Sequence, residues 1–286
     1  MVLRVLQIIL IVLFITFAVV LTKDYLKNRE QMKKKNRILN FVMSIILNIL
    51  DAMGIGTFAT STAFYQLTKM VDDKKIPGTL VVGCILPVIT EGLAFLTAVK
   101  VDVLTLAAML VSSTAGAFIG SKINHKVPVN GIRMTMGIGL MIAAVLMLGT
   151  MLDFLPAGGD DIGIKGIKLI IGCVIVFIIG ALYPLGIGSY APTLVLVSLL
   201  GMNPAVAFPI MMVGAAFNSA SSVHNFIQSG EFHRRVAFGF NTGGIIGVLI
   251  AVVVVISLPM QVLRWLVLCV VVYTSITMFL SAAKKD

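Results

Sequence analysis

Two short stretches place glycines and then a hydroxyl side chain inside strongly apolar sequence. The first reads LDAMGIGTFATS at residues 50–61, and the second reads LYPLGIGSYAPT at 182–193. An offset of 132 residues aligns Gly54, Gly56 and Thr57 with Gly186, Gly188 and Ser189. Glycine lets the backbone turn sharply, and a hydroxyl suits the start of a helix. Each stretch therefore predicts a broken helix, with Thr57 or Ser189 as the N-cap of its second arm.

The chemistry that two such breaks offer together is anion binding. Facing helix N-termini surround a small space with unpaired backbone N–H groups and the positive ends of two dipoles. The alternative is structural, because small residues also let membrane helices pack closely and hydroxyls often bond their own backbone. Two copies favour a binding site, with no catalytic residue, metal or cofactor. Its candidate substrate-binding residues are Gly54, Gly56, Thr57, Thr60, Ser61, Gly186, Gly188, Ser189, Tyr190, Thr193, Asn218 and Ser222.

Three ionisable residues within apolar sequence are candidates for proton coupling or gating, because charge is costly in a membrane. Glu91 lies fifteen residues into the run 77–99 and is suited to take up and release a proton; a hydrogen-bonded acid packed against a neighbouring helix is the alternative. Asp51 precedes the first break and is suited to cap or gate it. His224 is interpreted mainly as an interfacial hydrogen-bond donor.

Two other function classes compete with anion binding. An intramembrane serine protease would use Ser189 as nucleophile and His224 as base, but the repeat and the missing Gly-x-Ser-x-Gly elbow disfavour it. A cation or metal permease would use Asp51 and Glu91 as oxygen ligands. This second alternative stays open, although two acids on separate elements make a sparse metal site.

Composition determines the class of protein. The 286-residue chain is 59% apolar and 12% charged, with a mean hydropathy of +1.07, which excludes a soluble globular domain. A membrane-spanning helix needs about 20 residues. Uninterrupted apolar runs of that size lie near 2–22, 77–99, 102–121, 131–152, 204–228, 236–257 and 262–281. The interrupted regions are 38–71 and 166–201, and arms such as 38–53, about 24 Å as a helix, are too short to cross. We therefore expect helical hairpins with tips near the midplane.

Charge predicts the orientation in the cell membrane. Residues 23–37 hold seven Lys or Arg against two acids, which places this segment in the cytoplasm and the N-terminus outside. Further basic residues then fall at cytoplasmic loops and at a cytoplasmic C-terminus, and Arg133 is expected to reach lipid headgroups. The expected partners are the lipid bilayer and a small anionic substrate, not nucleic acid. A homo-oligomer remains open.

The similarity extends beyond the glycine tracts. Pro77 aligns with Pro209 at the same offset, and VPVNGIR at 127–133 aligns with LPMQVLR at 258–264 after a short gap. Each half holds a broken region and three full spans, an odd number of crossings, so the second half enters from the opposite side. The predicted fold is an all-α polytopic membrane protein with two inverted-topology repeats. Its units are an N-terminal anchor and basic loop at 1–37, a first repeat at 38–152, a linker at 153–165 and a second repeat at 166–283.

Over roughly residues 38–283 the chain resembles the sulfite exporter TauE/SafE (TSUP) family. The resemblance is carried by GIGTF and GIGSYAPT, by Pro77 and Pro209, by the run VKVDVLTLAAMLVSSTAGAFIGSKI, and by the Pro-x-x-x-x-Arg segments at 128–133 and 259–264. It implies a secondary transporter of small sulfur-containing anions such as sulfite or organosulfonates. The first tip departs from the family pattern, since GTFATST stands where more glycine and a proline are expected.

Overall fold

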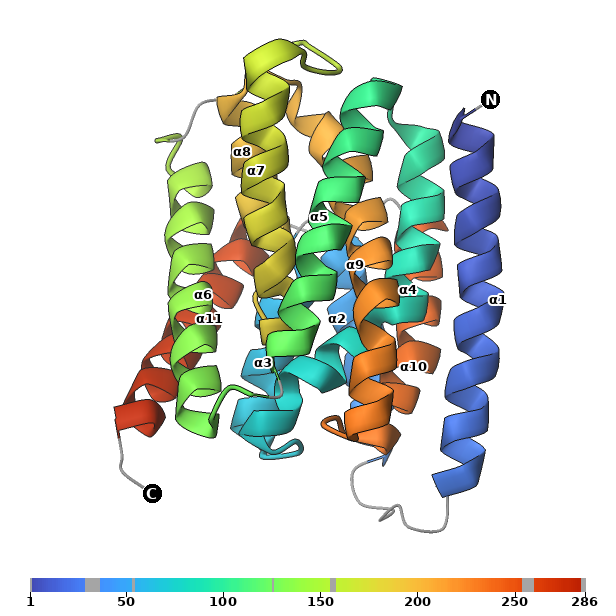
Figure 1. Ribbon diagram of the computed structural model, residues 1–286. Helices are drawn as coiled ribbons and strands as arrows, with labels where there is room; N and C mark the ends of the chain where they lie inside the picture. The colour runs from blue at the N-terminus through green and yellow to red at the C-terminus, as the bar shows by residue number, and fades with distance from the viewer. Residues whose placement is uncertain are drawn as a thin grey trace.

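The computed structural model describes residues 2–28, 37–52, 55–124, 126–154, 158–253 and 260–283, and these form a bundle of helices (Figure 1). The first part contains α1 (Val2–Asn28), α2 (Arg37–Ala52), α3 (Thr57–Thr68), η2 (Asp73–Lys75), α4 (Ile76–Ala98), α5 (Val103–Asn124) and α6 (Val129–Met151). The second part contains α7 (Gly166–Leu182), η3 (Tyr183–Leu185), α8 (Tyr190–Leu199), η4 (Pro204–Val206), α9 (Ala207–Ser229), α10 (Arg234–Val253) and α11 (Met260–Ala283).

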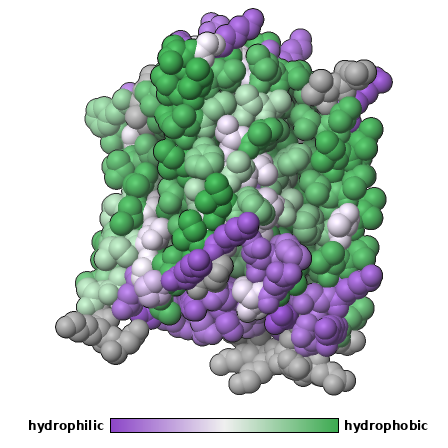
Figure 2. Space-filling model, viewed as in Figure 1, coloured by the Kyte–Doolittle hydropathy of each residue, from purple (hydrophilic) through white to green (hydrophobic). Residues whose placement is uncertain are grey.

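Length and hydropathy make this a multi-pass membrane protein. Within the described residues, seven helices are long and apolar enough to cross a bilayer. Six of them coincide with uninterrupted runs predicted from sequence, and the seventh run, 262–281, coincides with α11. The remaining one of the seven is α7 with η3, the first arm of the second broken region. Figure 2 shows a broad apolar band, with hydrophilic residues gathered mainly at the lower end of the view.

The centre of the bundle is the pair α4 and α9, which pack along each other and are far more buried than the other spans. Helix α4 also packs on α10, and α9 packs on α5. Helix α6 packs on α11 at one side of the bundle, whereas α1 lies at the opposite edge against α4 and α10 (Figure 1). The central pair is therefore flanked by α10 and α1, which pack on α4, and by α5, which packs on α9.

Glycines bring two pairs of helices into close contact. On α5, Gly116 and Gly120 lie against the backbone of α7, so that an added Cβ would collide with main-chain atoms. On α10, Gly243 and Gly247 lie in the same way against α2. Both are small-xxx-small pairs, which permit close backbone approach between membrane helices. The result is that α5 holds α7, and α10 holds α2.

The pairs α2–α3 and α7–α8 each form a hairpin that begins and ends at the same end of the bundle. We call one end the basic end; its loops and helix ends carry Lys74, Lys75, Lys122, Arg133, Arg234 and Arg235. There Asn40, early in α2, donates to the carbonyl of Val236, and Asp73, just after α3, pairs with Arg133. At the opposite end, the linker end with residues 158–165, Lys168 of α7 donates to the carbonyl of Leu200 after α8. Hairpin α2–α3 thus opens to the basic end and α7–α8 to the linker end.

Candidate functional site

The tip of the first hairpin is capped by a carboxylate. Gly56 precedes α3 with φ of 86°, a conformation that side chains rarely adopt, and α3 begins at Thr57. The Asp51 carboxylate accepts a 2.7 Å hydrogen bond from the backbone N–H of Thr57. The prediction that Thr57 is the N-cap was therefore wrong: Gly56 holds that position and Asp51 supplies the cap. Gly54 lies outside the described residues.

The tip of the second hairpin has no such cap. Helix α7 ends at Leu182, Pro184 lies in the following turn, and Gly186 takes φ of 89°. Ser189 occupies the N-cap position of α8, as predicted, but its side chain makes no capping hydrogen bond. Pro192 lies in the first turn of α8, where it has no N–H to leave unpaired. The side chain at the N-cap position thus leaves the N-terminus of α8 uncapped.

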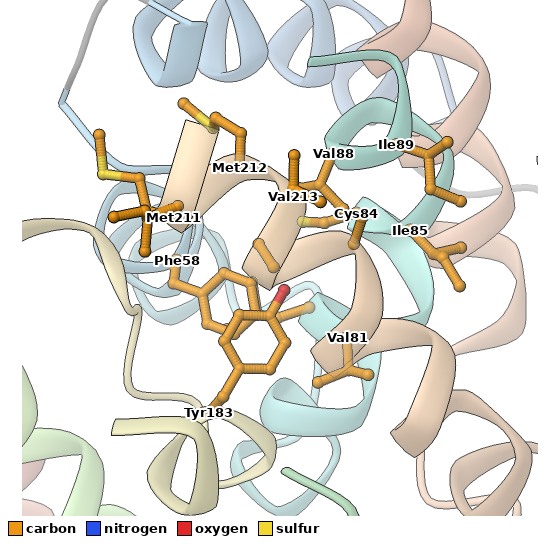
Figure 3. Packing of buried hydrophobic residues seen from close by; sticks show 14 of the residues in the cluster. Phe58, Val81, Cys84, Ile85, Val88, Ile89, Tyr183, Met211, Met212 and Val213 are labelled. Atoms are coloured by element: carbon orange, nitrogen blue, oxygen red, sulfur yellow. The ribbon is translucent and has the colours of Figure 1, made fainter. Parts of the chain in front are cut away.

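The two tips meet through reciprocal contacts. A Cβ on Gly188 would lie 3.1 Å from the Cβ of Phe58 in α3, and a Cβ on Gly56 would lie 3.5 Å from that of Tyr190 in α8. The rings of Phe58 and Tyr183 also pack, with centroids 4.5 Å apart (Figure 3). The glycine of each tip therefore accommodates the first residues of the other tip's helix.

A cavity of about 60 Å³ lies where the tips meet. Since a water molecule needs roughly 10–15 Å³ on this scale, the cavity is large enough for a few molecules of that size. Seven of the predicted site residues line it: Asp51, Gly56, Thr57, Gly186, Gly188, Ser189 and Tyr190. Residues that the sequence did not indicate complete the wall, from α6 (Gly139, Leu140, Ala143) and α9 (Met211, Met212, Ala215). Among the described lining residues there is no Lys, Arg or His.

A second cavity, of about 110 Å³, adjoins the first. The two share wall residues from both tips, including Ile55, Ala59 and Tyr190. The second cavity continues along α6 to Met147 and Thr150, near the linker end of that helix. The space between the tips therefore extends toward the linker end.

The family model for the sulfite exporter TauE/SafE matches residues 1–147 and 169–286. The chain belongs to the sulfite exporter TauE/SafE family. Its members are membrane transporters of sulfur-containing anions, not enzymes. No curated protein and no solved structure matches the chain significantly.

In this TauE/SafE chain, the hydroxyl groups near the first tip differ in their partners. The Thr60 hydroxyl donates to the carbonyls of Gly56 and Thr57, so it serves its own helix. Thr57 is buried and lines the cavity, and its hydroxyl has no hydrogen-bond partner among the described residues other than the neighbouring Asp51 carboxylate. Ser61 is also buried, and its hydroxyl has no partner among the described residues, but it does not line the cavity. Thr57 is thus the cavity-lining residue of the first tip whose hydroxyl is not bonded to its own helix.

The polar residues predicted on α9 lie beside the site rather than in it. Asn218 and Ser113 exchange hydrogen bonds of 2.8 and 3.0 Å, and Ser222 donates to the carbonyl of Ala117. Both interactions join α9 to α5. Asn218 and Thr193 line a separate small cavity of about 10 Å³ that Ser189 also lines. The structure thus brings Thr193 and Asn218 near the second tip and places Ser222 in helix packing.

The two acidic candidates come together. Asp51 on α2 and Glu91 on α4 interact electrostatically with each other, and both are buried. Apart from Asp51, no described residue offers either oxygen of Glu91 a hydrogen bond. His224, in contrast, lies exposed on α9 and does not line the cavity, so it is separated from the acidic pair and from Ser189.

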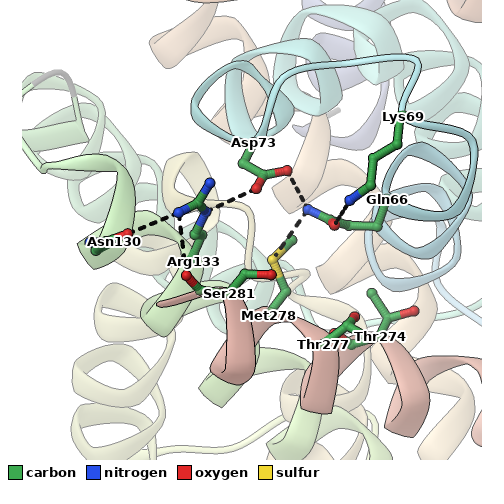
Figure 4. A network of polar contacts seen from close by, with 9 residues as sticks. All are labelled: Gln66, Lys69, Asp73, Asn130, Arg133, Thr274, Thr277, Met278 and Ser281. Atoms are coloured by element: carbon green, nitrogen blue, oxygen red, sulfur yellow. Dashed lines mark hydrogen bonds and ion pairs between the residues drawn. The ribbon is translucent and has the colours of Figure 1, made fainter. Parts of the chain in front are cut away.

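Arg133 belongs to a polar network at the basic end, which the sequence analysis did not anticipate (Figure 4). Its Nε lies 2.9 Å from Asp73 Oδ2, and it also donates to Asn130 and to the carbonyl of Ser281. Gln66 of α3 donates to the same Asp73 carboxylate. Arg133 therefore joins α6, α11 and the end of the first hairpin instead of reaching to lipid. The aligned Arg264 has a side chain outside the described residues.

Proposed function

We propose that this chain is a secondary transporter that binds a small sulfur-containing anion, such as sulfite or an organosulfonate, between the N-termini of α3 and α8. The observation that carries the proposal is the cavity lined by both hairpin tips. At the N-terminus of α8, which the Ser189 side chain does not cap, backbone N–H groups and the positive end of the helix dipole favour an anion. The hydroxyls of Thr57 and Ser189 add side-chain donors at the cavity wall.

The absence of Lys or Arg from the described cavity wall fits a carrier. A transported anion must leave again, and dipoles and hydroxyls hold it less tightly than a fixed positive charge. The apolar residues of α6 and α9 that complete the wall keep water scarce, which strengthens the interaction of an anion with helix dipoles. The site is thus suited to transient binding.

We further propose that residues 38–152 and 166–283 are inverted repeats. The helix contacts support this idea, because the main packings between the two halves occur in matching pairs: α2 on α10 corresponds to α7 on α5, and α4 on α10 to α9 on α5. The glycine pairs of α5 and α10 and the reciprocal Gly56 and Gly188 contacts follow the same correspondence. Alternating access would then come from movement of one half against the other around the tips.

The sidedness of the transporter follows from charge. The basic end would face the cytoplasm by the positive-inside rule, which places the N-terminus outside and the C-terminus inside. In this orientation the cavities, which extend toward the linker end, would be directed outward. We propose that the Asp73–Arg133 network closes the cytoplasmic side. An inside-negative potential favours anion efflux by about 2.3 kcal/mol per charge per 100 mV.

Counterflow of labelled sulfite in proteoliposomes tests this function, with sulfoacetate, taurine, sulfate and chloride as competitors. The double variant Thr57→Val, Ser189→Ala should weaken sulfite binding at least tenfold, since it removes two donors from the wall. Thr60→Val is the matched control, because the Thr60 hydroxyl bonds only its own helix in the described structure. Unchanged binding in the double variant would move the site away from the tips.

A cation permease remains the second candidate, because Asp51 and Glu91 do come together. In the described residues, no group of three or more His, Cys, Asp or Glu side chains could hold a metal ion. Two carboxylates alone make a poor site for a divalent cation. Cation flux in the same vesicles that is lost in Glu91→Gln, without any sulfite flux, would favour this candidate over the anion carrier.

A further inference from the structure

Asp51 places a carboxylate at the spot where the first helix N-terminus meets the cavity. Its oxygen accepts the Thr57 N–H at 2.7 Å, and the residue itself lines the cavity. The chain thus already carries an anion of its own at one of the two N-termini that the proposed function offers to a substrate. An ionised Asp51 and a bound substrate anion would repel each other across this small space.

Glu91 adds a second carboxyl group to the same place. It is fully buried and interacts with Asp51, and no other described residue offers either of its oxygens a hydrogen bond. Among the described residues, the other titratable groups that face the pair are Cys84 of α4 and Tyr183 of η3, and neither supplies positive charge. Because two adjacent buried carboxylates without a basic partner cannot both stay ionised, the pair must hold at least one proton.

Resting on the proposed function, we propose that Asp51 and Glu91 form a proton site coupled to the substrate site. With the cavity free of substrate, the pair carries one proton and one negative charge, and the charge caps α3. When a substrate anion enters, the pair takes up a second proton, which removes the repulsion and frees the dipole of α3 for the substrate. Anion and proton would then bind together and leave together.

The second hairpin indicates that this device belongs to the first tip alone. The residues aligned with Asp51 and Glu91 at an offset of 132 are Tyr183 and Val223. The hydroxyl of Tyr183 forms a 2.8 Å hydrogen bond with Ser219 of α9, and it does not cap α8. Tyr183→Phe is therefore a matched control: it changes the corresponding position without removing a carboxyl group.

Calorimetric titration of the purified protein with methanesulfonate tests the coupling. A sulfonate keeps its charge over the working pH range, so protons taken up belong to the protein. Titrations in two buffers of different ionisation enthalpy give the number of protons bound with each anion. The wild type and Tyr183→Phe should take up close to one proton at mildly alkaline pH, and their affinity should fall about tenfold per pH unit there.

Asp51→Asn should take up no proton, and its affinity should be independent of pH. The amide oxygen of Asn can still accept the Thr57 N–H, so the cap is retained while the competing charge is removed. This variant should therefore bind methanesulfonate more tightly than the wild type at alkaline pH, whereas a purely structural role for Asp51 would weaken binding. An unchanged pH profile in Asp51→Asn would overturn the proposal.

The remaining outcomes separate this proposal from the proposed function. If the wild type binds methanesulfonate without proton uptake, the proton coupling is refuted and the anion carrier stands. If binding requires Na⁺, the Asp51–Glu91 pair is a cation site, and the proton coupling is refuted as well. Failure to bind either methanesulfonate or sulfite removes both proposals. Infrared difference spectra give a readout without substrate: the carbonyl band of a protonated carboxylic acid should be present in the wild type and lost in Glu91→Gln.

Discussion

The two hairpin tips share a backbone plan but differ in chemistry. Each tip turns through a glycine with φ near 90°, Gly56 or Gly186. Gly56 and Gly188 pack against the first residues of the other tip's helix. The first tip, however, caps its helix with the Asp51 carboxylate, whereas the second leaves α8 without a side-chain cap. The comparison indicates that close packing constrains the shape of both tips, while the charge at each N-terminus can change independently.

The largest expected effect concerns the glycines that pack α5 on α7 and α10 on α2. In Gly120→Ala and Gly247→Ala the new methyl group would collide with backbone atoms of α7 and α2, respectively. Because a backbone cannot move aside as a flexible side chain can, each variant should lose roughly 3 kcal/mol of stability, measured by thermal unfolding in detergent. Gly214→Ala is the control, since its Cβ would meet only Leu110 at 3.8 Å. A large loss in one variant alone would argue against equivalent roles for the two helix pairs.

The next effect compares the two tip glycines. Gly56→Ala places a side chain at φ of 86° and should cost about 1–2 kcal/mol from backbone strain. Gly188 is not among the positive-φ residues; in Gly188→Ala the cost comes from the 3.1 Å approach to Phe58, which can shift. We therefore expect Gly56→Ala to lower the unfolding temperature more than Gly188→Ala. Phe58→Leu keeps the Cβ that Gly188→Ala would approach, so it should rescue neither variant.

Sequence patterns anticipated the helices and the hairpins better than the contacts between them. Runs of apolar residues locate the spans because length and hydropathy are local properties, and the Gly-Ile-Gly tracts locate both breaks. The start of α3 was misplaced by one residue, since a hydroxyl at Thr57 looks like a cap until Gly56 is seen to take that position. Packing alone brings Asp51 to Glu91, because forty residues separate them in the chain.

Arg133 is a second residue whose contact with a distant part of the chain could not be predicted from the sequence. An arginine at the end of an apolar run is usually expected to reach lipid headgroups. Its partner Asp73 lies sixty residues away, in a loop that the sequence pattern does not place beside α6. The wall residues Gly139 and Met211 carried no signal either, because small and apolar residues are common throughout membrane helices.

The third prediction concerns closure of the basic end. The Asp73–Arg133 pair is mostly buried, with side-chain exposures of 16% and 19%, and it ties the first hairpin to α6. Arg133→Gln should shift the protein toward a state open at the basic end by about tenfold, as expected for loss of a partly buried charged hydrogen bond of roughly 1.4 kcal/mol. The measurement is the rate at which a membrane-impermeant thiol reagent modifies Met278→Cys, which is buried near Gln66, in a Cys269→Ser background.

Lys74→Gln provides the matched control for this gate. It breaks the ion pair with Glu231 at the same end, but Lys74 is 43% exposed and such pairs contribute little. Labelling of Met278→Cys should therefore stay near the wild-type rate in Lys74→Gln. Equal acceleration in both variants would mean that general loss of charge, and not the Arg133 network, opens the basic end.

The smallest effects concern two helix caps at opposite ends of the bundle. The Asp102 carboxylate accepts the backbone N–H and the hydroxyl of Thr105 at the start of α5, and these hydrogen bonds hold the pKa of Asp102 below its ordinary value of 3.8. At the start of α10, His233 Nδ1 accepts the N–H of Val236, and burial lowers the pKa of His233 below its ordinary value of 6.5. Both caps therefore act in their deprotonated forms.

Acid should weaken the two caps in different pH ranges. A group whose pKa is lower in the folded protein stabilises fully above its unfolded pKa and loses that contribution as pH falls. The His233 contribution should thus decline below about pH 6.5, and the Asp102 contribution only below about pH 4. His233→Asn and Asp102→Asn keep an acceptor but do not titrate, so each should flatten its own part of the profile of unfolding temperature against pH. Asp102→Ala should cost about 1 kcal/mol at neutral pH. If His233→Asn instead left the decline below pH 6.5 intact, the neutral imidazole would not be the group that caps α10, and that decline would belong to another titrating group.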